Sequence, residues 1–441
     1  MKLFGTDGLR GRAGEFPLDP ASVRRLGREL GWRLPGGAAR VVVGGDTRES
    51  TPWIVAEICA GLGETGRGVA VAGIITTPGV AELVLELGAS AGIAVSASHN
   101  PYEDNGIKIF GPDGRKWPDE EEEHLERRLL EQAGRPETAD SPRRPGTDPG
   151  LVATYISRLS TGAGGNLDGL SILIDAGNGA AFQIGPRAFH RAGARVTAIH
   201  DAPDGRNINR DCGALHPEAM ARHTRESGVA LGVAFDGDAD RSIFADETGR
   251  ILDGDDVLWI VARDWKKRGW LGHAGVVATV MSNFGLEAAL AREGIPFRRS
   301  AVGDRNVARL MDESGAVLGG ETSGHILLAP LSPAGDGILT ALVLSSIVKA
   351  SGRKLSELAT LEKVPQTLRN VRVARRVAIE ECSGIRGALR KAEDTLRYRG
   401  RVFLRYSGTE PLLRILVEGQ EAGEVKTIAD ELEAAAKAEL T

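Results

Sequence analysis

The sequence is poor in cysteine, which argues against a fold held together by disulfides. Only three cysteines occur among the 441 residues, at Cys59, Cys212 and Cys382, far apart and odd in number. They form no C-x-x-C pair of the kind that binds zinc or carries out redox chemistry. We therefore expect three thiols that are buried or incidental.

Long hydrophobic runs and blocks of positive charge are also missing. No segment reaches the roughly 18 apolar residues of a membrane span, and the first residues lack the apolar core of about 7 to 15 residues that signal peptides contain. The net charge is -5 and the basic residues are spread along the chain, which gives no electrostatic footprint for nucleic acid. With 41% hydrophobic and 26% charged residues, the composition is that of a soluble globular protein. We expect a cytoplasmic protein with no membrane partner and no nucleic-acid partner.

The order of predicted elements is typical of α/β domains. A strand-like run at 40–44, a helix to about residue 62 and a strand at 68–72 give a strand, helix, strand order that recurs over 170–199. The acidic run at 119–123 predicts a solvated helix start rather than a metal cluster. Residues 135–150 are rich in proline, glycine and charge, which indicates a linker with a domain boundary at its end. At roughly 150 residues per domain, the length suggests about three domains, with four within the scatter.

Glycines, 58 in all, cluster with Asp, Ser and Asn in short loops where chemistry is expected. The loop S-A-S-H-N-P at 96–101 follows a short apolar run that is predicted to be a buried strand. Asn100-Pro101 favours a turn, so the strand delivers Ser98 to that turn beside the imidazole of His99. A hydroxyl presented in this way suits a covalent phosphoryl or acyl carrier. On these six residues alone, a hydrogen-bonded loop remains the alternative.

The most specific chemistry lies in D-G-D-A-D-R at 236–241, between two strand-like segments. Asp236, Asp238 and Asp240 alternate along the chain, so their carboxylates project to one side, as a hard divalent cation requires. An acidic turn is the plain alternative. A calcium EF-hand loop is rejected, because Arg241 stands at the sixth position, where glycine is needed, and the flanks are strands rather than helices. The set instead suits Mg²⁺ held next to a phosphate.

Other loops carry polar groups that suit binding of phosphate or of sugar hydroxyls. Arg10 lies in G-T-D-G-L-R-G, where backbone N–H groups and a guanidinium suit a phosphate, with a glycine turn as the alternative. Lys108 is on the polar face of a predicted strand, where most lysines are simply solvated. The loop at 319–325, G-G-E-T-S-G-H, either reads sugar hydroxyls or forms a polar turn. Arg405 and Arg414 flank Ser, Gly and Thr in a predicted anion clamp.

Together these loops resemble the four active-site loops of the α-D-phosphohexomutase superfamily, over nearly the whole chain. In chain order they are S-A-S-H-N-P, D-G-D-A-D-R, G-E-T-S-G-H and R-Y-S-G-T-E-P. Within the superfamily, the start K-L-F-G-T-D-G-L-R-G, Met281-Ser282-Asn283 and Val302-Gly303-Asp304-Arg305 are most similar to bacterial phosphoglucosamine mutases, which interconvert glucosamine 6-phosphate and glucosamine 1-phosphate. The resemblance implies three α/β domains with mixed sheets and a smaller C-terminal α+β domain around a central cleft. Their expected bounds are 1–150, 151–249, 250–363 and 364–441.

The resemblance also implies a role for each loop. The catalytic residues would be Ser98, Arg10, Lys108, His99, Arg241 and His325, the last a candidate proton donor or acceptor. Mg²⁺ would be bound by Asp236, Asp238, Asp240 and the phosphorylated Ser98. The sugar would be held by Glu321, Thr322 and Ser323. The phosphate that is not reacting would be held by Arg405, Ser407, Gly408, Thr409 and Arg414.

Under this hypothesis, phosphoserine donates its phosphoryl group to the free sugar hydroxyl, and the bisphosphorylated intermediate turns round to return its other phosphate to Ser98. A sugar 1,6-bisphosphate is the expected activator. The protein is expected to be a monomer or homodimer that acts in amino-sugar metabolism for cell-wall precursors.

Some positions depart from the phosphoglucosamine mutase pattern. Thr322 replaces the usual amide in the sugar loop, so phosphomannomutase or phosphoglucomutase activity is the alternative. Asn306 replaces an aromatic residue, Ala239 a glycine, and A-L-H at 214–216 stands where S-T-H is usual. A catalytically silent sugar-phosphate sensor is a third hypothesis, but a sensor could dispense with Ser98 and the metal carboxylates, and all are present.

Overall fold

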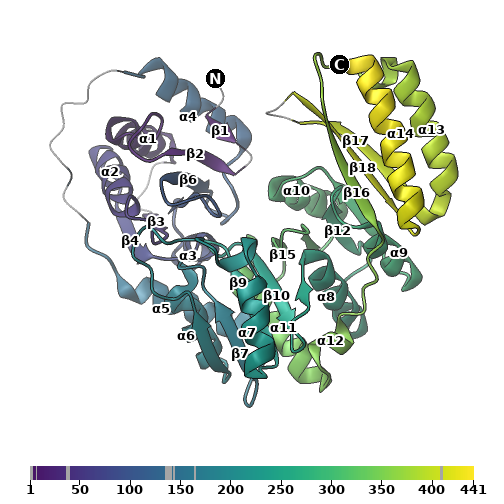
Figure 1. Cartoon of the computed structure of the whole chain (residues 1–441). Helices are drawn as coiled ribbons and strands as arrows, with labels where there is room; N and C mark the ends of the chain where they lie inside the picture. The colour runs from purple at the N-terminus through teal and green to yellow at the C-terminus, as the bar shows by residue number, and fades with distance from the viewer. Residues whose placement is uncertain are drawn as a thin grey trace. The chain divides into compact units, whose positions relative to one another are not determined.

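The computed structural model describes residues 3–5, 7–35, 40–134, 142, 145–162, 165–407 and 411–441 (Figure 1). Their contacts divide the chain into two compact units. The first unit comprises Met1–Thr279 and Ser300–Thr360, and the second comprises Val280–Arg299 and Leu361–Thr441. Among the described residues, no helix is both long and apolar enough to cross a membrane.

The first sheet is mixed and has the strand order β1-β2-β6-β5-β3-β4. Central β3 pairs in parallel with β4 and β5, whereas β6 is antiparallel to β5 and to β2. Both β3 and β5 are fully buried, as expected of central parallel strands covered by helices on both faces. The strands are β1 (Phe4–Gly5), β2 (Gly8–Arg12), β3 (Val41–Gly45), β4 (Val69–Ile74), β5 (Ala91–Val95) and β6 (Asp104–Phe110). The helices are α1 (Pro20–Arg33), α2 (Thr51–Glu64), α3 (Thr77–Leu87) and α4 (Asp119–Glu131).

The second sheet has the order β11-β10-β9-β7-β8 and is also mixed. Strand β7 is parallel to β8 and β9, and β10 is antiparallel to β9 and β11. The strands are β7 (Ser171–Asp175), β8 (Arg195–Ile199), β9 (Leu231–Phe235), β10 (Ser242–Asp246) and β11 (Ile251–Leu252). The helices are α5 (Pro149–Gly162), α6 (Ala181–Arg191), the single turn η1 (Gly213–Leu215) and α7 (Glu218–Ser227).

In the third sheet, β12 (Val276–Thr279) is parallel to β14 (Leu318–Gly320), which is antiparallel to β15 (Ile326–Leu328). Two helices of this region begin at aspartate N-caps, Asp253 before α8 and Asp336 before α11, where a carboxylate accepts the first free backbone N–H groups. The helices are α8 (Gly254–Arg268), α10 (Asp304–Ser314), α11 (Gly337–Ser351) and α12 (Leu355–Leu358).

The second unit contains α9 (Phe284–Arg292), most of β13 (Phe297–Ser300) and a small antiparallel sheet with the order β16-β18-β17. Helices α13 and α14 pack on this sheet through a separate core that includes Ile385, Leu413, Ile415 and Leu432. The elements are β16 (Gln366–Arg372), η2 (Ile379–Glu381), α13 (Ser383–Leu396), η3 (Arg397–Arg399), β17 (Gly400–Tyr406), β18 (Leu412–Gly419) and α14 (Ala422–Leu440).

The predicted fold class is confirmed, with three α/β regions and a smaller C-terminal antiparallel sheet with helices. Helix α5 begins at Pro149, inside the predicted linker. The acidic run does begin helix α4, but the expectation that its charges are solvated is wrong for Glu122. That side chain is buried and pairs with Arg305 at 2.8 Å, a partner too distant in sequence to predict.

Candidate active site

Ser98 lies in a tight turn directly after β5. Its side chain is fully buried, and its backbone adopts a left-handed conformation with φ of 52°. This conformation costs a residue with a Cβ about 1–2 kcal/mol, so the surrounding contacts must hold it. The Ser98 N–H donates to Ser96 Oγ at 2.9 Å, and the Ser98 carbonyl accepts from Arg48 Nη2 at 3.1 Å. The turn therefore presents the Ser98 hydroxyl in one fixed direction.

A buried ion pair at the end of β3 holds this turn. Arg48 pairs with Asp46, and both side chains are fully buried. Asp46 also accepts a 2.5 Å hydrogen bond from Ser96 Oγ, and Arg48 donates to the Asn100 carbonyl at 2.6 Å. Parallel strands β3 and β5 end at the same edge of the sheet, which brings these segments together. No role was predicted for Asp46 or Arg48, although a D-T-R triplet directly after a predicted strand was the available signal.

The three aspartates follow β9 and face the Ser98 turn. Oδ2 of Asp236 accepts a 2.6 Å hydrogen bond from Ser98 Oγ. All three carboxylates are buried and offer oxygens within 4.8 Å of one another. Among the described residues, Oδ1 of Asp238 and Oδ1 of Asp240 have no hydrogen-bond partner and are shielded from solvent. Unbonded, buried oxygens in an oxygen-only set are the ligands that Mg²⁺ prefers, so these residues fit that ion.

The aspartate loop and the Ser98 turn interlock. A Cβ on Gly237 would lie 2.5 Å from the Ser98 carbonyl oxygen, so only glycine allows this approach. Asn209 Nδ2 donates to the same carbonyl at 2.9 Å. Thr77, at the start of α3, donates through its N–H to the Asp238 carbonyl (3.1 Å) and through Oγ1 to the Asp238 carboxylate (2.5 Å). Loops from the first and second sheets therefore form one rigid assembly, and the roles of Asn209 and Thr77 were not predicted.

Ala239 occupies a backbone position that favours glycine. It is fully buried, and its φ is 56°, in the left-handed region. The departure from glycine noted in the sequence therefore falls where a Cβ costs about 1–2 kcal/mol.

Lys108 lies among three carboxylates. Its Nζ is 2.9 Å from Asp238 Oδ2, 3.1 Å from Asp240 Oδ2 and 2.9 Å from Asp7 Oδ2. Only 1% of its side chain is exposed, so the solvated alternative is wrong. Burial lowers the pKa of Lys108, but the attraction of Asp238, Asp240 and Asp7 outweighs it and raises that pKa well above its usual value. Lys108 is therefore a permanent cation beside the candidate metal ligands.

The pKa values of Asp236 and Asp240 are shifted in opposite directions. Burial, together with repulsion from Asp240 and Asp238, raises the pKa of Asp236 well above its usual value. For Asp240, burial also raises the pKa, but the positive charges of Lys108 and His325 outweigh it and bring the pKa well below its usual value. A divalent cation at this position would favour the ionised form of Asp236 and so oppose the effect of burial.

Next to the hydroxyl, His99 and Arg241 form a short polar chain. His99 Nδ1 lies 3.3 Å from Ser98 Oγ and 3.2 Å from Arg241 Nη1. Burial, with the charges of Arg241 and Arg10, lowers the pKa of His99, so the ring is neutral at neutral pH. Arg241 is also anchored by its N–H to Asp236 Oδ1 at 3.2 Å. Arg10 reaches the same turn, with Nη1 3.4 Å from Asn100 Oδ1.

His325, the last residue of the predicted sugar loop, faces two carboxylates. Its Nδ1 is 3.8 Å from Asp240 Oδ2 and its Nε2 is 3.6 Å from Asp304 Oδ2. Although burial lowers the pKa of His325, the nearby negative charges of Asp240 and Asp304 raise it to about 9. The ring is thus a cation at neutral pH.

Two neighbouring residues of the predicted sugar loop, Glu321 and Thr322, contact other segments of the first unit. Glu321 Oε1 accepts from the N–H of Gly303 at 3.0 Å. Thr322 Oγ1 donates toward the buried carboxylate of Asp255, 3.3 Å from each oxygen. Ser323 is exposed.

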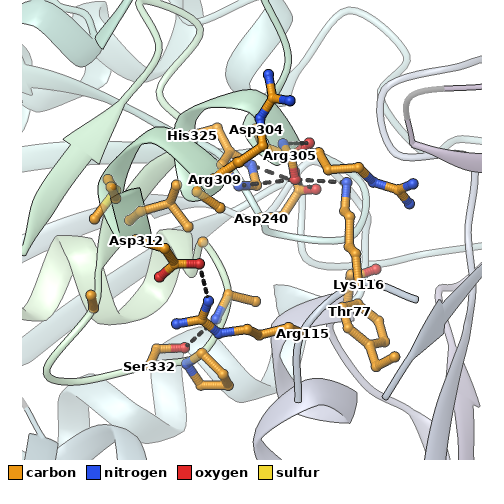
Figure 2. A pocket seen from close by; sticks show the side chains of 18 residues that line it. Thr77, Arg115, Lys116, Asp240, Asp304, Arg305, Arg309, Asp312, His325 and Ser332 are labelled. Carbon is orange, nitrogen blue, oxygen red and sulfur yellow. Dashed lines mark hydrogen bonds and ion pairs between the residues drawn. The ribbon is translucent and has the colours of Figure 1, made fainter. Parts of the chain in front are cut away.

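A cavity of about 260 Å³ lies beside His325. Its lining includes Asp240, Asp304, His325 and Lys116 (Figure 2). Figure 2 shows Lys116 directed toward Asp304, and their Nζ and Oδ2 atoms are 2.6 Å apart. Lys116 also binds Asp7 Oδ1 at 2.5 Å, so it links the cavity wall to the carboxylate beside Lys108. No role was predicted for Lys116, Asp7 or Asp304, although Asp7 and Asp304 lie in motifs that carried the resemblance.

The predicted anion clamp lies in the second unit. Arg405 on β17 is directly opposite Arg414 on β18. Like charges in this position destabilise a strand pair, and burial together with Arg414 lowers the pKa of Arg405. The carbonyl of Ser407 accepts from Arg376 Nη2 at 2.6 Å, which brings a third guanidinium to the strand end. Gly408 and Thr409 lie outside the described residues.

Comparison with known proteins decides the family. Four models of phosphoglucomutase/phosphomannomutase domains match the chain: the alpha/beta/alpha domain I at residues 1–135, domain II at 153–249, domain III at 253–364 and the C-terminal domain at 368–435. A phosphoglucosamine mutase from Koribacter versatilis is 48% identical over 430 residues, covering 95% of this chain and 93% of that protein. The chain belongs to the phosphoglucomutase/phosphomannomutase family.

Other members agree with this assignment. Phosphoglucosamine mutases from Deinococcus deserti and Symbiobacterium thermophilum are 47% and 43% identical, covering 97% and 100% of this chain and 96% and 99% of theirs. A family crystal structure from Burkholderia thailandensis has a TM-score of 0.81 at 24% identity, over 99% of this chain and 97% of that one. An Aspergillus fumigatus N-acetylphosphoglucosamine mutase, solved with GlcNAc-6P and magnesium, has a TM-score of 0.67 at 18% identity, over 100% and 96%. The last two likenesses establish the fold alone, and the superfamily resemblance is confirmed.

Within this family fold, one cluster contains most of the predicted catalytic and metal-binding residues. Contacts at hydrogen-bond or ion-pair distance join Ser98, His99, Arg241, Asp236, Asp238, Asp240, Lys108 and His325, with Arg10 joined through Asp7 and Asn100. The residues of the predicted anion clamp belong to the second unit. The catalytic, metal-binding and substrate-binding roles remain predictions.

Proposed function

We propose that the chain interconverts glucosamine 6-phosphate and glucosamine 1-phosphate, the activity of a phosphoglucosamine mutase. Relatives with that name, 43–48% identical over almost the whole chain, support this substrate pair. The observation that carries the chemistry is the 2.6 Å contact between Ser98 Oγ and Asp236, beside two carboxylates with unbonded buried oxygens. A single carboxylate is enough to accept the hydrogen bond of a buried hydroxyl, so the two further carboxylates indicate a role in binding a cation.

The proposed cycle begins with phosphorylated Ser98. In the first half-reaction, the bond between Ser98 Oγ and phosphorus breaks, and the phosphorus bonds to the free sugar hydroxyl, whose proton ends on Ser98 Oγ. The neutral His99, 3.3 Å from Ser98 Oγ, is placed to pass this proton. His325 holds a proton at neutral pH, so on the sugar side it would donate a hydrogen bond, and it would have to lose that proton before it could accept the one from the sugar hydroxyl. The second half-reaction is the reverse at the other phosphate.

Charge around the transferring group is offset by this chain's cations. Lys108, Arg10 and Arg241 would face the phosphoryl oxygens. Mg²⁺, held by Asp236, Asp238, Asp240 and the phosphoserine, would supply further neutralisation when bound. A sugar 1,6-bisphosphate would rephosphorylate enzyme that has lost its phosphoserine by hydrolysis.

The intermediate must bind in two orientations, so its other phosphate needs a separate site. We assign this role to Arg405, Ser407, Gly408, Thr409 and Arg414. An anion between Arg405 and Arg414 would relieve the repulsion of the opposed guanidinium groups. The four-domain division at 150, 249 and 363 and a monomeric or homodimeric state are part of the same proposal.

Sugar recognition is assigned to Glu321, Thr322 and Ser323. The Thr322 hydroxyl is turned toward the carboxylate of Asp255. The replacement of the usual amide by threonine therefore changes a contact inside the protein, and it is compatible with an amino sugar as substrate. Activity on glucose or mannose phosphates is the second candidate, since position 322 departs from the phosphoglucosamine mutase pattern.

A coupled assay with Mg²⁺ and a sugar bisphosphate activator distinguishes the amino-sugar substrate from the neutral-sugar alternative. It compares kcat/KM for glucosamine 1-phosphate, glucose 1-phosphate and mannose 1-phosphate. A preference for the amino sugar is expected, and a preference for a neutral sugar would keep the family and overturn the substrate. Ser98→Ala should abolish turnover of every sugar while the circular dichroism spectrum stays unchanged, with Ser351→Ala, at the end of α11, as the control. Wild-type rates in Ser98→Ala would overturn the mechanism.

A further inference from the structure

A second group of metal-ligating side chains lies in the second α/β region, apart from the three aspartates. Asp175 is the last residue of β7, His200 follows β8 directly, and Cys212 precedes η1. The two parallel strands end at the same edge, and the loop after β8 returns to it, so three segments meet there. One carboxylate oxygen, one imidazole nitrogen and the Cys212 sulfur lie within 4.8 Å of one another.

The local contacts of these groups leave ligand capacity in the middle of the cluster. Asp175 is fully buried, and each of its oxygens accepts one backbone N–H, from Gly177 at 2.9 Å and from Gly213 at 3.1 Å. Each oxygen therefore keeps a free lone pair. The contacts also fix the carboxylate without turning it away from His200.

His200 Nδ1 gives the second, independent observation. It lies 3.0 Å from Asp175 Oδ2 and is shielded from solvent, yet it makes no hydrogen bond of acceptable geometry among the described residues. A buried ring nitrogen in this position ordinarily bonds the carboxylate beside it. Here the nitrogen and the oxygen lie at ion-pair distance, and both lie within 4.8 Å of the Cys212 sulfur, as ligands of one ion do.

We propose that Asp175, His200 and Cys212 form a second cation site, for Zn²⁺ or another transition metal ion of similar softness. One oxygen, one nitrogen and one sulfur ligand, with water as the fourth, is a common tetrahedral zinc set, whereas Mg²⁺ prefers oxygen alone. The thiol must lose its proton to bind. Burial raises the pKa of Cys212 to about 12, so the ion would displace a proton that the metal-free protein keeps.

The site would act on the loop that supports the nucleophile. Asn209, three residues before Cys212, donates its N–H to the Gly177 carbonyl at 2.8 Å and its side-chain amide to the Ser98 carbonyl at 2.9 Å. An ion joining β7, His200 and Cys212 would clamp the segment between His200 and Cys212. It would thereby stiffen one of the supports of the Ser98 turn.

Cobalt(II) absorption of the full-length protein tests the site, because a thiolate bound to Co²⁺ gives a charge-transfer band that an oxygen-only site cannot give. Excess Mg²⁺ is added so that the aspartate site is occupied. We expect one Co²⁺ per chain with this band in the wild type, in Cys59→Ser, which removes another buried thiol, and in Asp236→Asn, which alters the aspartate site. Cys212→Ser should lose the band.

His200→Asn is the second variant, because asparagine tolerates the left-handed backbone at this position, where φ is 47°. It should bind Co²⁺ at least about tenfold more weakly, since even a residue that only orients a ligand usually contributes that much. Absence of the thiolate band from the wild type would overturn the proposal and leave a plain contact between His200 and Asp175 beside a buried thiol. A band that survives in Cys212→Ser would overturn it equally.

Discussion

Replacing Lys108 by methionine should make the stability of the first unit depend strongly on Mg²⁺. Methionine preserves the length of the buried stem and removes the charge that Asp7, Asp238 and Asp240 share at 2.9–3.1 Å. Removing one partner of a buried ion pair typically costs about 3–5 kcal/mol, because the other charge stays buried without compensation. We expect a loss of this size in the unfolding free energy measured with EDTA.

The loss should shrink when Mg²⁺ is added. An ion that binds only the folded state adds about 2.7 kcal/mol when its concentration is 100 times its dissociation constant. In the variant this ion would also replace the compensation that Lys108 gave to Asp238 and Asp240, so the stabilisation by Mg²⁺ should exceed that of the wild type. Turnover should nevertheless fall, since the proposed mechanism needs the Lys108 cation beside the phosphoryl group.

Urea denaturation followed by tryptophan fluorescence measures this unit selectively. All six tryptophans, the last of them Trp270, lie in the first unit. Lys349→Met is the matched control, because Lys349 is exposed on α11 and its Nζ donates to the backbone carbonyl of Asp168 at 2.7 Å rather than to a carboxylate. The control should melt like the wild type. The reasoning fails if Lys108→Met melts like the control in EDTA, or if its deficit is the same with and without Mg²⁺.

Two further predictions concern pH and backbone strain. His325 has a pKa of about 9 in the folded protein against 6.5 ordinarily. Its protonation should therefore stabilise the metal-free fold below pH 6.5, and this contribution should disappear as the pH rises through 9. His325→Asn should flatten that part of the stability profile, and an unchanged profile would contradict the raised pKa. Ala239→Gly should raise the melting temperature, because it removes about 1 kcal/mol of left-handed strain. A lower melting temperature would show that the Ala239 methyl packing matters more.

Local sequence predicted the parts of the site that a single loop carries. Ser98 follows a recognisable strand and turn, and the alternating aspartates lie within five residues, so both could be found without knowledge of the fold. The surroundings of Lys108 could not, because the alternation in β6 fixes the face of the side chain, whereas Asp238 and Asp240 reach it from another sheet. Whether a lysine on such a face is solvated or buried depends on that second sheet.

The same reason explains the supports that were missed. Arg48 contacts the carbonyls of the Ser98 turn across 50 residues, and Asn209 does so across 111. A polar residue after a strand is common, and only tertiary packing distinguishes a structural support from a surface residue. The pairing of Arg405 with Arg414 was easier to predict, since the two residues lie on consecutive antiparallel strands, whereas their role as an anion clamp remains a prediction.

The close approach of Gly237 to the Ser98 carbonyl has a consequence for exchanging parts between family members. A side chain at position 237 has no room, and the Asn209 amide binds the same Ser98 carbonyl. The loop that carries Ser98 and the loops that carry Gly237 and Asn209 must therefore be closely complementary in shape. A chimaera that takes residues before α5 from one relative and those after it from another would join two halves of this contact that were selected separately. Crossover points within the second unit would leave this contact intact. In libraries of recombined mutases, chimaeras with such crossovers should therefore be active more often than chimaeras that cross over at α5.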